Sequence, residues 1–190
     1  LYWLAINREP TSASALCEDI LNSAEVEDVQ ESLELLNNRS LVQSIAGVYY
    51  DLHPVIQEYV SNCLVNKICE EIECRDIDLF HAIALLKSQS RDYTRATQEK
   101  FILQPIKRKL TRSREIRGRG RTINRLEEIL RSHRDNFQKE EGYLAGNILD
   151  LMICLDADME GRDFSNLCVW QSYLRNQELH NVNFSHSDLS

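Results

Sequence analysis

The chain of 190 residues is 43% hydrophobic and holds only 3 prolines and 6 glycines, which excludes a disordered or fibrous protein and leaves room for one ordinary core or two small ones. No apolar run reaches the roughly 18 residues that a membrane span requires, and the start has no signal-peptide form, so we expect a cytoplasmic protein without a membrane contact. The net charge of −8 divides into −11 over residues 1–80 (4 basic, 15 acidic), +8 over 81–141 (16 basic, 8 acidic) and −5 over 142–190 (2 basic, 7 acidic), which predicts separate modules.

The N-terminal part has the pattern of short helices. Residues 1–6 show the apolar face of a helix already under way, without a methionine or a cap, so we expect a fragment of a longer chain. Pro10 and the hydroxyl residues that follow it predict the start of a helix over 12–21. A second helix is predicted over 26–37, where apolar side chains recur on one face.

Two short β-type runs follow, 41–45 and 48–52, joined through Ala46 and Gly47. Their spacing predicts a hairpin. Helices followed by a short hairpin predict a winged-helix domain over residues 1–60. Because the two helices of this domain are acidic, they would repel a phosphate backbone, and we expect the domain to pack against protein rather than DNA.

From Pro54 onward the pattern is helical almost throughout. Pro54 suits the first turn of a long helix, where its missing N–H costs nothing. One apolar stripe follows it: Ile56, Tyr59, Val60, Cys63, Leu64, Ile68 and Ile72. Further helices are predicted near 77–88, 92–113, 122–137 and 143–156. Together they predict a mainly α fold in which a helical arm, an all-α bundle, occupies residues 61–160.

Residues 161–190 follow a period of five. On one phase of it lie Phe164, Val169, Leu174, Leu179, Phe184 and Leu189. A helix repeats every 3.6 residues and a strand every two, so neither accounts for this spacing. A square β-solenoid does, because each five-residue face points one apolar side chain inward, and the segment is predicted to begin a pentapeptide-repeat-like solenoid. The alternative is an irregular tail with chance spacing.

Motifs for catalysis or metal binding are weak. The cysteines form no Cys-x-x-Cys pair, so we expect buried thiols in a reducing compartment rather than a metal site. They are Cys17, Cys63, Cys69, Cys74, Cys154 and Cys168. No phosphate loop and no Ser-His-Asp or Cys-His set can be assembled, so no catalytic residue and no metal ligand is predicted. His180 and His186 are expected to be exposed.

The segment 107–121, KRKLTRSREIRGRGR, holds eight Lys or Arg in 15 residues. Such a run attracts nucleic acid by neutralising phosphates, but no aromatic residues are interleaved for base stacking. The alternatives are a solvated helix end and loop, or a face that meets the acidic N-terminal module. Binding of nucleic acid is therefore the second hypothesis.

Longer phrases of the sequence are similar to a known family. "LYWLAINREPTS", "LELLNNRSLV" and "YYDLHPVIQEYV" resemble the winged-helix part of signal-transduction ATPases of the NB-ARC (STAND) type, especially cyanobacterial ones. "LLKSQSRDYTRATQEKFILQPI", "GYLAGNILDLM" and "DFSNLCVWQSYL" resemble the helical arm that follows in those proteins. There the arm leads into pentapeptide repeats or a WD-repeat sensor. The resemblance covers nearly the whole chain.

The resemblance implies a role for His53. In that family the histidine of a Met-His-Asp motif contacts the phosphate of bound ADP and helps to hold the closed state, and Leu52-His53-Pro54 occupies the matching place. An imidazole suits this task because it can donate a hydrogen bond to phosphate. Pro54 stands where the family often has Asp, which puts the local loop hydrogen bonding in doubt. The alternative is a histidine that caps the wing or the helix.

The function that the resemblance implies is a non-catalytic regulatory and scaffold fragment of a nucleotide-switched signalling ATPase. This fragment needs no cofactor of its own; ADP or ATP would bind to an upstream nucleotide-binding module of the same chain. That module and a downstream repeat domain are the expected partners, with self-assembly on activation as a further expectation. Release of the nucleotide clamp would swing the helical arm between two packings. A nucleic-acid-binding winged helix with a basic arm is the alternative.

Overall fold

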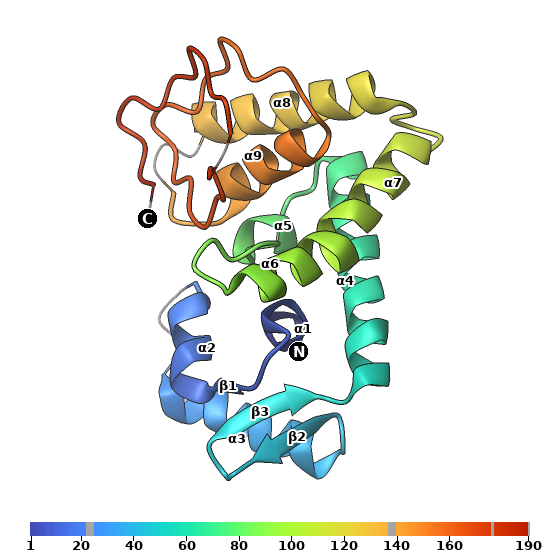
Figure 1. Ribbon diagram of the computed structural model, residues 1–190, viewed down its shortest axis with the longest axis vertical. Helices are drawn as coiled ribbons and strands as arrows, with labels where there is room; N and C mark the ends of the chain where they lie inside the picture. The colour runs from blue at the N-terminus through green and yellow to red at the C-terminus, as the bar shows by residue number, and fades with distance from the viewer. Residues whose placement is uncertain (22–24, 137–139, 176, 190) are drawn as a thin grey trace.

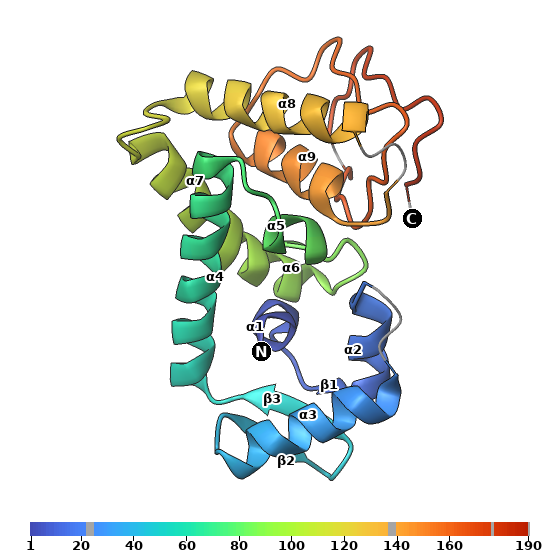
Figure 2. The ribbon, with the colours of Figure 1, turned by 180° about the vertical axis from the view of Figure 1, so that it is seen from behind.

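The computed structural model describes residues 1–21, 25–136, 140–175 and 177–189. It is mainly helical, with a small three-stranded antiparallel sheet. The sheet and the helices nearest to it lie at one end of the molecule, the helical bundle fills the middle, and the C-terminal segment packs against the bundle at the other end (Figure 1 and Figure 2). The acidic N-terminal part and the C-terminal segment are thus both in contact with the bundle.

Short elements make up the N-terminal part. In chain order they are α1 (Tyr2–Asn7), β1 (Thr11–Ser12), α2 (Ala13–Asp19), α3 (Val26–Asn38), β2 (Val42–Ile45) and β3 (Tyr49–Leu52). The strand order is β1-β3-β2, with Val42 opposite Leu52 and Thr11 opposite Tyr50. Both predicted helices and the predicted hairpin are confirmed. The sequence did not predict β1, because two residues are too few to show a strand's alternation.

A small hydrophobic core holds these elements together. Its buried members are Leu4, Ala5, Ala13, Leu16, Leu33, Val42, Tyr50, Leu52 and Val60. The hairpin turn has φ 52° at Ala46 and φ 70° at Gly47. Positive φ at both central residues is what a type I′ turn requires, and it matches the twist of the flanking strands.

Helix α4 (Pro54–Cys74) belongs to two cores. Pro54 lies in its first turn, as predicted, and the helix ends where Arg75 enters the left-handed region (φ 61°). Val60 packs in the N-terminal core, whereas Leu64 and Ile68 pack in the core of the bundle. The helix therefore crosses the predicted boundary between residues 60 and 61 without a break.

The bundle is completed by the later helices. These are α6 (Asp92–Gln98), the π-helical turn η1 (Glu99–Leu103), α7 (Gln104–Arg112), α8 (Arg119–Asn136) and α9 (Leu144–Cys154). They confirm the helices predicted over 92–113, 122–137 and 143–156, although residue 137 lies outside the described residues. Pro105 accounts for the π-helical turn. It has no N–H to donate to the carbonyl of Phe101, and in a regular α-helix its ring would clash with that carbonyl, so the helix widens here.

The helix predicted over 77–88 is wrong for most of its length. Helix α5 (Leu79–Ala82) is a single turn, and the chain is extended at Ile83 (φ −134°, ψ 145°). Residues 83–86 are all buried. A short apolar run does not distinguish a buried non-helical segment from a buried helix, and here the chain is irregular rather than helical after Ala82.

Buried polar side chains replace the helical hydrogen bonds that this segment lacks. The Glu71 carboxylate accepts hydrogen bonds from the backbone N–H groups of residues 78–80 at 2.9–3.1 Å. The Gln98 amide donates to the carbonyl of Ile6 at 2.9 Å, and its oxygen accepts the N–H of Lys87 at 3.1 Å. Because buried backbone groups need partners, these two side chains fix both ends of the segment.

Asn147 of α9 fixes the middle of the same segment. Its side-chain amide donates to the carbonyls of Phe80 and Ile83 at 2.8 and 2.7 Å, and its oxygen accepts the N–H of Leu85 at 2.8 Å. The side chain is buried and all three contacts are made to backbone. One amide from α9 therefore determines how an irregular stretch crosses the bundle.

The C-terminal segment returns on itself after one loop of chain. A parallel β-bridge joins Asp163 to Asn183, which are 20 residues apart, and a second bridge of the same separation lies five residues further on. The ring of Phe164 stacks on that of Phe184, with centroids 5.7 Å apart. Four periods of five residues therefore bring the chain back over itself.

Left-handed backbone recurs along this segment at every fifth residue that the structure describes. Positive φ, between 52° and 71°, is found at Asp156, Gly161, Asn166, Gln171, Asn181 and His186. Residue 176, the remaining position of the series, lies outside the described residues. No strand is assigned in the described part of 157–189, and no solenoid is detected there. The fold that the structure establishes is therefore helical with a small sheet.

Candidate functional site

His53 stands between β3 and α4. It is the N-cap residue of α4 with φ −58° and ψ 140°, an extended conformation that the following Pro54 favours. Its carbonyl accepts the N–H of Gln57 at 2.9 Å, but its side chain makes no capping hydrogen bond. The residue is exposed. The imidazole therefore does not cap the helix and is open to a partner.

Apolar side chains are exposed on the two elements that meet at His53. Val55 and Tyr59, one turn apart on α4, are 70% and 69% exposed, and Val48 and Tyr49 of the hairpin are 57% and 48% exposed. Single exposed apolar residues are common, but several on adjoining elements are typical of a surface that contacts protein.

A groove of about 660 Å³ lies beside the first turns of α4. Pro54, the neighbour of His53, is part of its wall. Arg8, Lys100 and Arg108 also line it, against the single carboxylate of Glu58 among its lining residues. The excess of positive charge suits an anionic group.

Arg8 is held in place at this groove. Its guanidinium lies 4.7 Å from the centroid of the Phe101 ring, and Nη2 donates to the Ser61 hydroxyl at 3.1 Å. Its Nε is buried and has no partner among the described residues, and burial lowers the pKa of Arg8. A buried donor of this kind has unused capacity for a phosphate or carboxylate oxygen.

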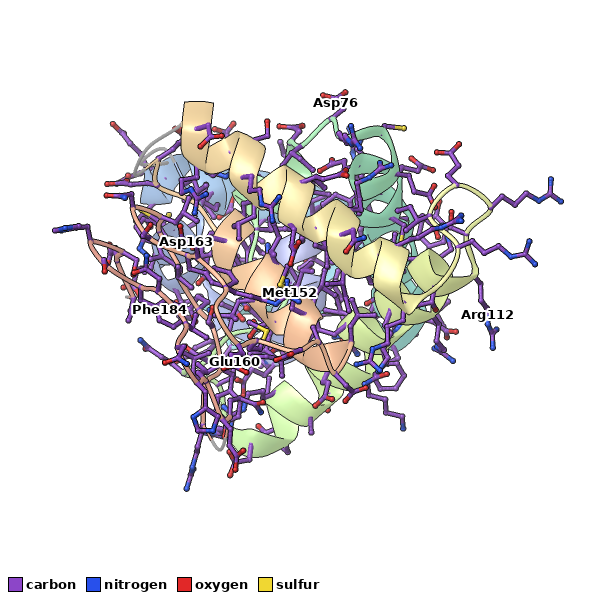
Figure 3. All side chains as sticks on the ribbon, turned by 90° about the horizontal axis from the view of Figure 1, so that it is seen from above. Asp76, Arg112, Met152, Glu160, Asp163 and Phe184 are labelled. Carbon is purple, nitrogen blue, oxygen red and sulfur yellow. The ribbon has the colours of Figure 1, made fainter. Side chains whose placement is uncertain are left out.

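The basic segment 107–121 contacts the end of α9. Lys107 donates to the last carbonyl of α9 and pairs with Asp156 at 3.3 Å, while Arg119 donates to the carbonyl of Asp156. Positive charge at a helix C-terminus complements the helix dipole. Other cationic side chains project outward near Arg112 (Figure 3). Part of the segment is thus used inside the molecule and part faces solvent.

The acidic N-terminal part meets the bundle through a different contact. The Lys87 ammonium pairs with the Asp19 carboxylate at 2.7 Å, and the Tyr143 hydroxyl donates to the Asp19 carbonyl at 2.9 Å. The rings of Trp3 and Tyr143 form a T-shaped contact with centroids 5.4 Å apart. Burial, followed by the charge of Asp19, raises the pKa of Tyr143 to about 12, so this hydroxyl stays a hydrogen-bond donor.

A second groove, of about 1160 Å³, separates the N-terminal part from the bundle. Tyr2 and Trp3 lie on one wall, and His81 and His133 on another. Sequence reasoning missed both histidines, because neither belongs to a motif and only the fold brings them together.

Asp150 of α9 is a buried carboxyl group. Its Oδ1 accepts the backbone N–H of Tyr173 at 3.2 Å. Burial raises the pKa of Asp150 to about 8, although the Tyr173 hydrogen bond acts in the opposite direction. The carboxyl group therefore keeps its proton in the folded state at neutral pH.

Stability is expected to fall as the pH rises from about 5.5 to 7. In that window the folded chain binds the Asp150 proton and the unfolded chain does not, so unfolding becomes easier by about 1.4 kcal/mol per pH unit, or about 2 kcal/mol in all. Asp150→Asn keeps an acceptor for Tyr173 and removes the titration. Denaturant unfolding at both pH values measures the difference; an equal pH dependence in the two proteins contradicts the prediction.

A comparison with curated proteins finds a relative that matches the whole chain. The chain is 35% identical, over 223 aligned positions that cover all of it, to a segment of an uncharacterized WD repeat-containing protein from the cyanobacterium Nostoc sp.. It is therefore homologous to a region of a larger WD-repeat protein, and it spans 18% of that relative's length. No protein-family model and no solved structure matches the chain. Of the helices in the described residues, none has the length and hydropathy to cross a bilayer.

Proposed function

We propose that this chain is a non-catalytic coupling module of a nucleotide-switched signalling ATPase of the NB-ARC type. The observation that carries the proposal is α4, which begins beside the exposed His53 and runs unbroken into the core of the bundle. A contact made at the first turn is thereby joined by one helix to the body that holds the C-terminal segment. ADP or ATP binding and any hydrolysis belong to a neighbouring module of a longer chain.

The topology of residues 1–60 supports a winged-helix assignment. The order is helix, strand, two helices and a hairpin, with the first strand beside the last in the sheet. Helix α3 exposes the carboxylates of Glu27, Asp28 and Glu31, which oppose a phosphate backbone. This domain would therefore pack on protein.

His53 would contact the phosphate of ADP bound to that neighbouring module. The exposed imidazole supplies a donor, and the groove with Arg8, Lys100 and Arg108 adds positive charge on the adjoining surface. If His53 made this contact only while ADP is bound, the contact would stabilise the resting packing of the domains. Loss of the contact would shift the population toward the active packing.

The C-terminal segment supports a connection to a repeat domain. Three features of the described residues fit one coil of a square β-solenoid: bridges between residues 20 apart, left-handed backbone at the described positions of the five-residue series, and buried Phe164 and Val169. We assign 61–160 to the helical arm and 161–190 to the start of a pentapeptide-repeat-like solenoid. The WD repeats in the relative's name fit a repeat sensor elsewhere in a longer chain. Self-assembly on activation is a further part of the proposal.

Nucleic-acid binding is the weaker alternative. Its support is the group of cationic side chains near Arg112 that face solvent (Figure 3). Against it, Lys107 and Arg119 are engaged at the end of α9, and α3 is acidic.

The proposed function predicts that His53→Ala weakens ADP retention in the full-length chain. Losing one hydrogen bond to a charged phosphate costs about 1.5–3 kcal/mol, which is a roughly tenfold to hundredfold loss of affinity. The measurement is the molar ratio of ADP to protein after purification and denaturation.

His186→Ala is the matched control for this experiment, because His186 is equally an exposed histidine but lies in the C-terminal segment. Its ADP content should equal that of the unchanged protein. Equal ADP content in the His53 variant would remove the sensor role from His53.

A further inference from the structure

Two histidines and one glutamate come together on the wall of the larger groove. His81 belongs to α5, His133 to α8, and Glu140 precedes α9. The imidazole centroids are 5.1 Å apart, and one ligand atom from each of the three side chains lies within 4.8 Å of the others. Two nitrogen donors and one carboxylate oxygen are the donor set of a transition-metal site with an open position.

The ring of His81 is oriented by the backbone that follows Glu140. Its Nε2 lies 3.1 Å from the carbonyl oxygen of Glu141. Because a carbonyl only accepts, Nε2 carries the hydrogen, which leaves the lone pair of the neutral ring on Nδ1. A metal-binding histidine characteristically donates its other ring nitrogen to such a carbonyl.

Nδ1 of His81 is a buried polar atom that has no hydrogen-bond partner among the described residues. Buried polar atoms in native proteins almost always have one, so this position calls for a ligand. The surroundings are shaped around the ring: a side chain at Gly142 would begin 2.2 Å from it. The imidazole of His81 therefore fits at this place because residue 142 has no side chain.

The surroundings of His133 favour its uncharged imidazole. Burial, followed by the nearby His81, lowers the pKa of His133, while Glu140 acts in the opposite direction. Its ring is therefore neutral at pH 7, as coordination through nitrogen requires.

We propose that His81, His133 and Glu140 bind a divalent transition-metal ion of the zinc type, with water or a further group from the groove in the remaining position. Tetrahedral coordination at about 2.0–2.1 Å places ligand atoms about 3.4 Å apart, so the present cluster must contract by about 1 Å. Glu140 is exposed and can supply most of that movement. The ion would tie α5, α8 and the chain entering α9 to one another.

This site is independent of the proposed nucleotide coupling, because it involves neither His53 nor its groove. The first test adds Zn²⁺ to the metal-free chain. Isothermal titration calorimetry measures binding, and thermal unfolding measures the change in Tm. We expect one equivalent to bind and the Tm to rise by roughly 5–10 °C at a Zn²⁺ concentration about one hundred times Kd. A titration without heat and without a Tm shift would overturn the proposal.

The second test assigns the ligands. His133→Asn is expected to weaken Zn²⁺ binding by at least roughly 100-fold, and Glu140→Gln by roughly 10–100-fold. Glu141→Gln is the matched control: it changes a neighbouring carboxylate while keeping the backbone carbonyl that orients His81, and it should bind as the unchanged chain does. Circular dichroism before metal addition shows that each variant is folded.

Co²⁺ distinguishes these ligands from the cysteines of the chain. Coordination by two imidazoles and a carboxylate gives visible d–d bands but no thiolate charge-transfer band in the near ultraviolet. A strong charge-transfer band, or binding that is unchanged in both the His133 and the Glu140 variants, would place the ion elsewhere and refute this site.

Discussion

Asn147→Leu is expected to lower the free energy of unfolding by about 3–5 kcal/mol. The substitution removes the buried amide that satisfies the carbonyls of Phe80 and Ile83 and the N–H of Leu85. Leucine has a similar volume, so the cost comes from three backbone groups that lose their partners rather than from a cavity. Denaturant unfolding followed by circular dichroism measures the change.

Asn62→Leu is the control for this substitution, because Asn62 lies on α4 and is exposed. The same chemical change there should alter stability by no more than about 0.5 kcal/mol. Equal effects at the two positions would show that Asn147 does not have the role described. Amide hydrogen exchange adds a local test, since the N–H of Leu85 should lose protection in the Asn147 variant.

Gly146→Ala is expected to cost about 3 kcal/mol, concentrated where α9 meets the C-terminal segment. An added Cβ at this helical position would lie 2.0 Å from the carbonyl oxygen of Trp170 and 3.1 Å from the Ser172 hydroxyl. The first contact is with backbone, so either α9 or the segment must move. Tryptophan fluorescence, together with limited proteolysis after residue 157, measures release of the segment.

Gly120→Ala supplies the matched control. Gly120 also lies in a helix, α8, but a Cβ there meets nothing within 4 Å. Alanine is the better helix former, so this variant should be neutral or more stable by up to about 1 kcal/mol. A destabilised Gly120 variant, or a Gly146 variant with unchanged stability, would contradict the close approach of Trp170.

Local patterns were sufficient to predict most of the secondary structure. Pro54 predicted the start of the long helix, and the pair Ala46 and Gly47 predicted the hairpin, because each signal depends only on neighbouring residues. The period of five predicted the start of a pentapeptide-repeat-like solenoid over 161–190. No solenoid is detected in the described part of this segment, although the ring of Phe164 stacks on that of Phe184, 20 residues further along the chain.

The segment 77–88 could not be predicted in the same way. Its conformation depends on Glu71, Gln98 and Asn147, which lie on other helices. Residues 83–86 are apolar whether the segment is helical or extended, so local periodicity cannot decide between the two. The conformation is determined by hydrogen bonds to these three side chains, which lie close to the segment only in the folded protein.

The candidate sites show the same division. The resemblance to NB-ARC ATPases singled out His53, with a capping histidine as the alternative; the structure shows that the residue is exposed and that its side chain makes no capping hydrogen bond. His81 and His133 carry no signal of their own, since they lie on different helices and no motif relates them. The partnerless Arg8 Nε likewise follows from packing between α1 and η1, not from spacing along the chain.

Because α4 is continuous from Pro54 to Cys74, it forms a rod about 32 Å long. A tilt of about ten degrees at its first turn would carry its far end through roughly 5–6 Å, about one helical pitch. The helix is unbroken between His53 and the bundle, so in the proposed function a small displacement at the surface around His53 would be enlarged along the helix. Amplification of this kind needs a stiff rod, and the side chains packed along both halves of α4 provide the stiffness.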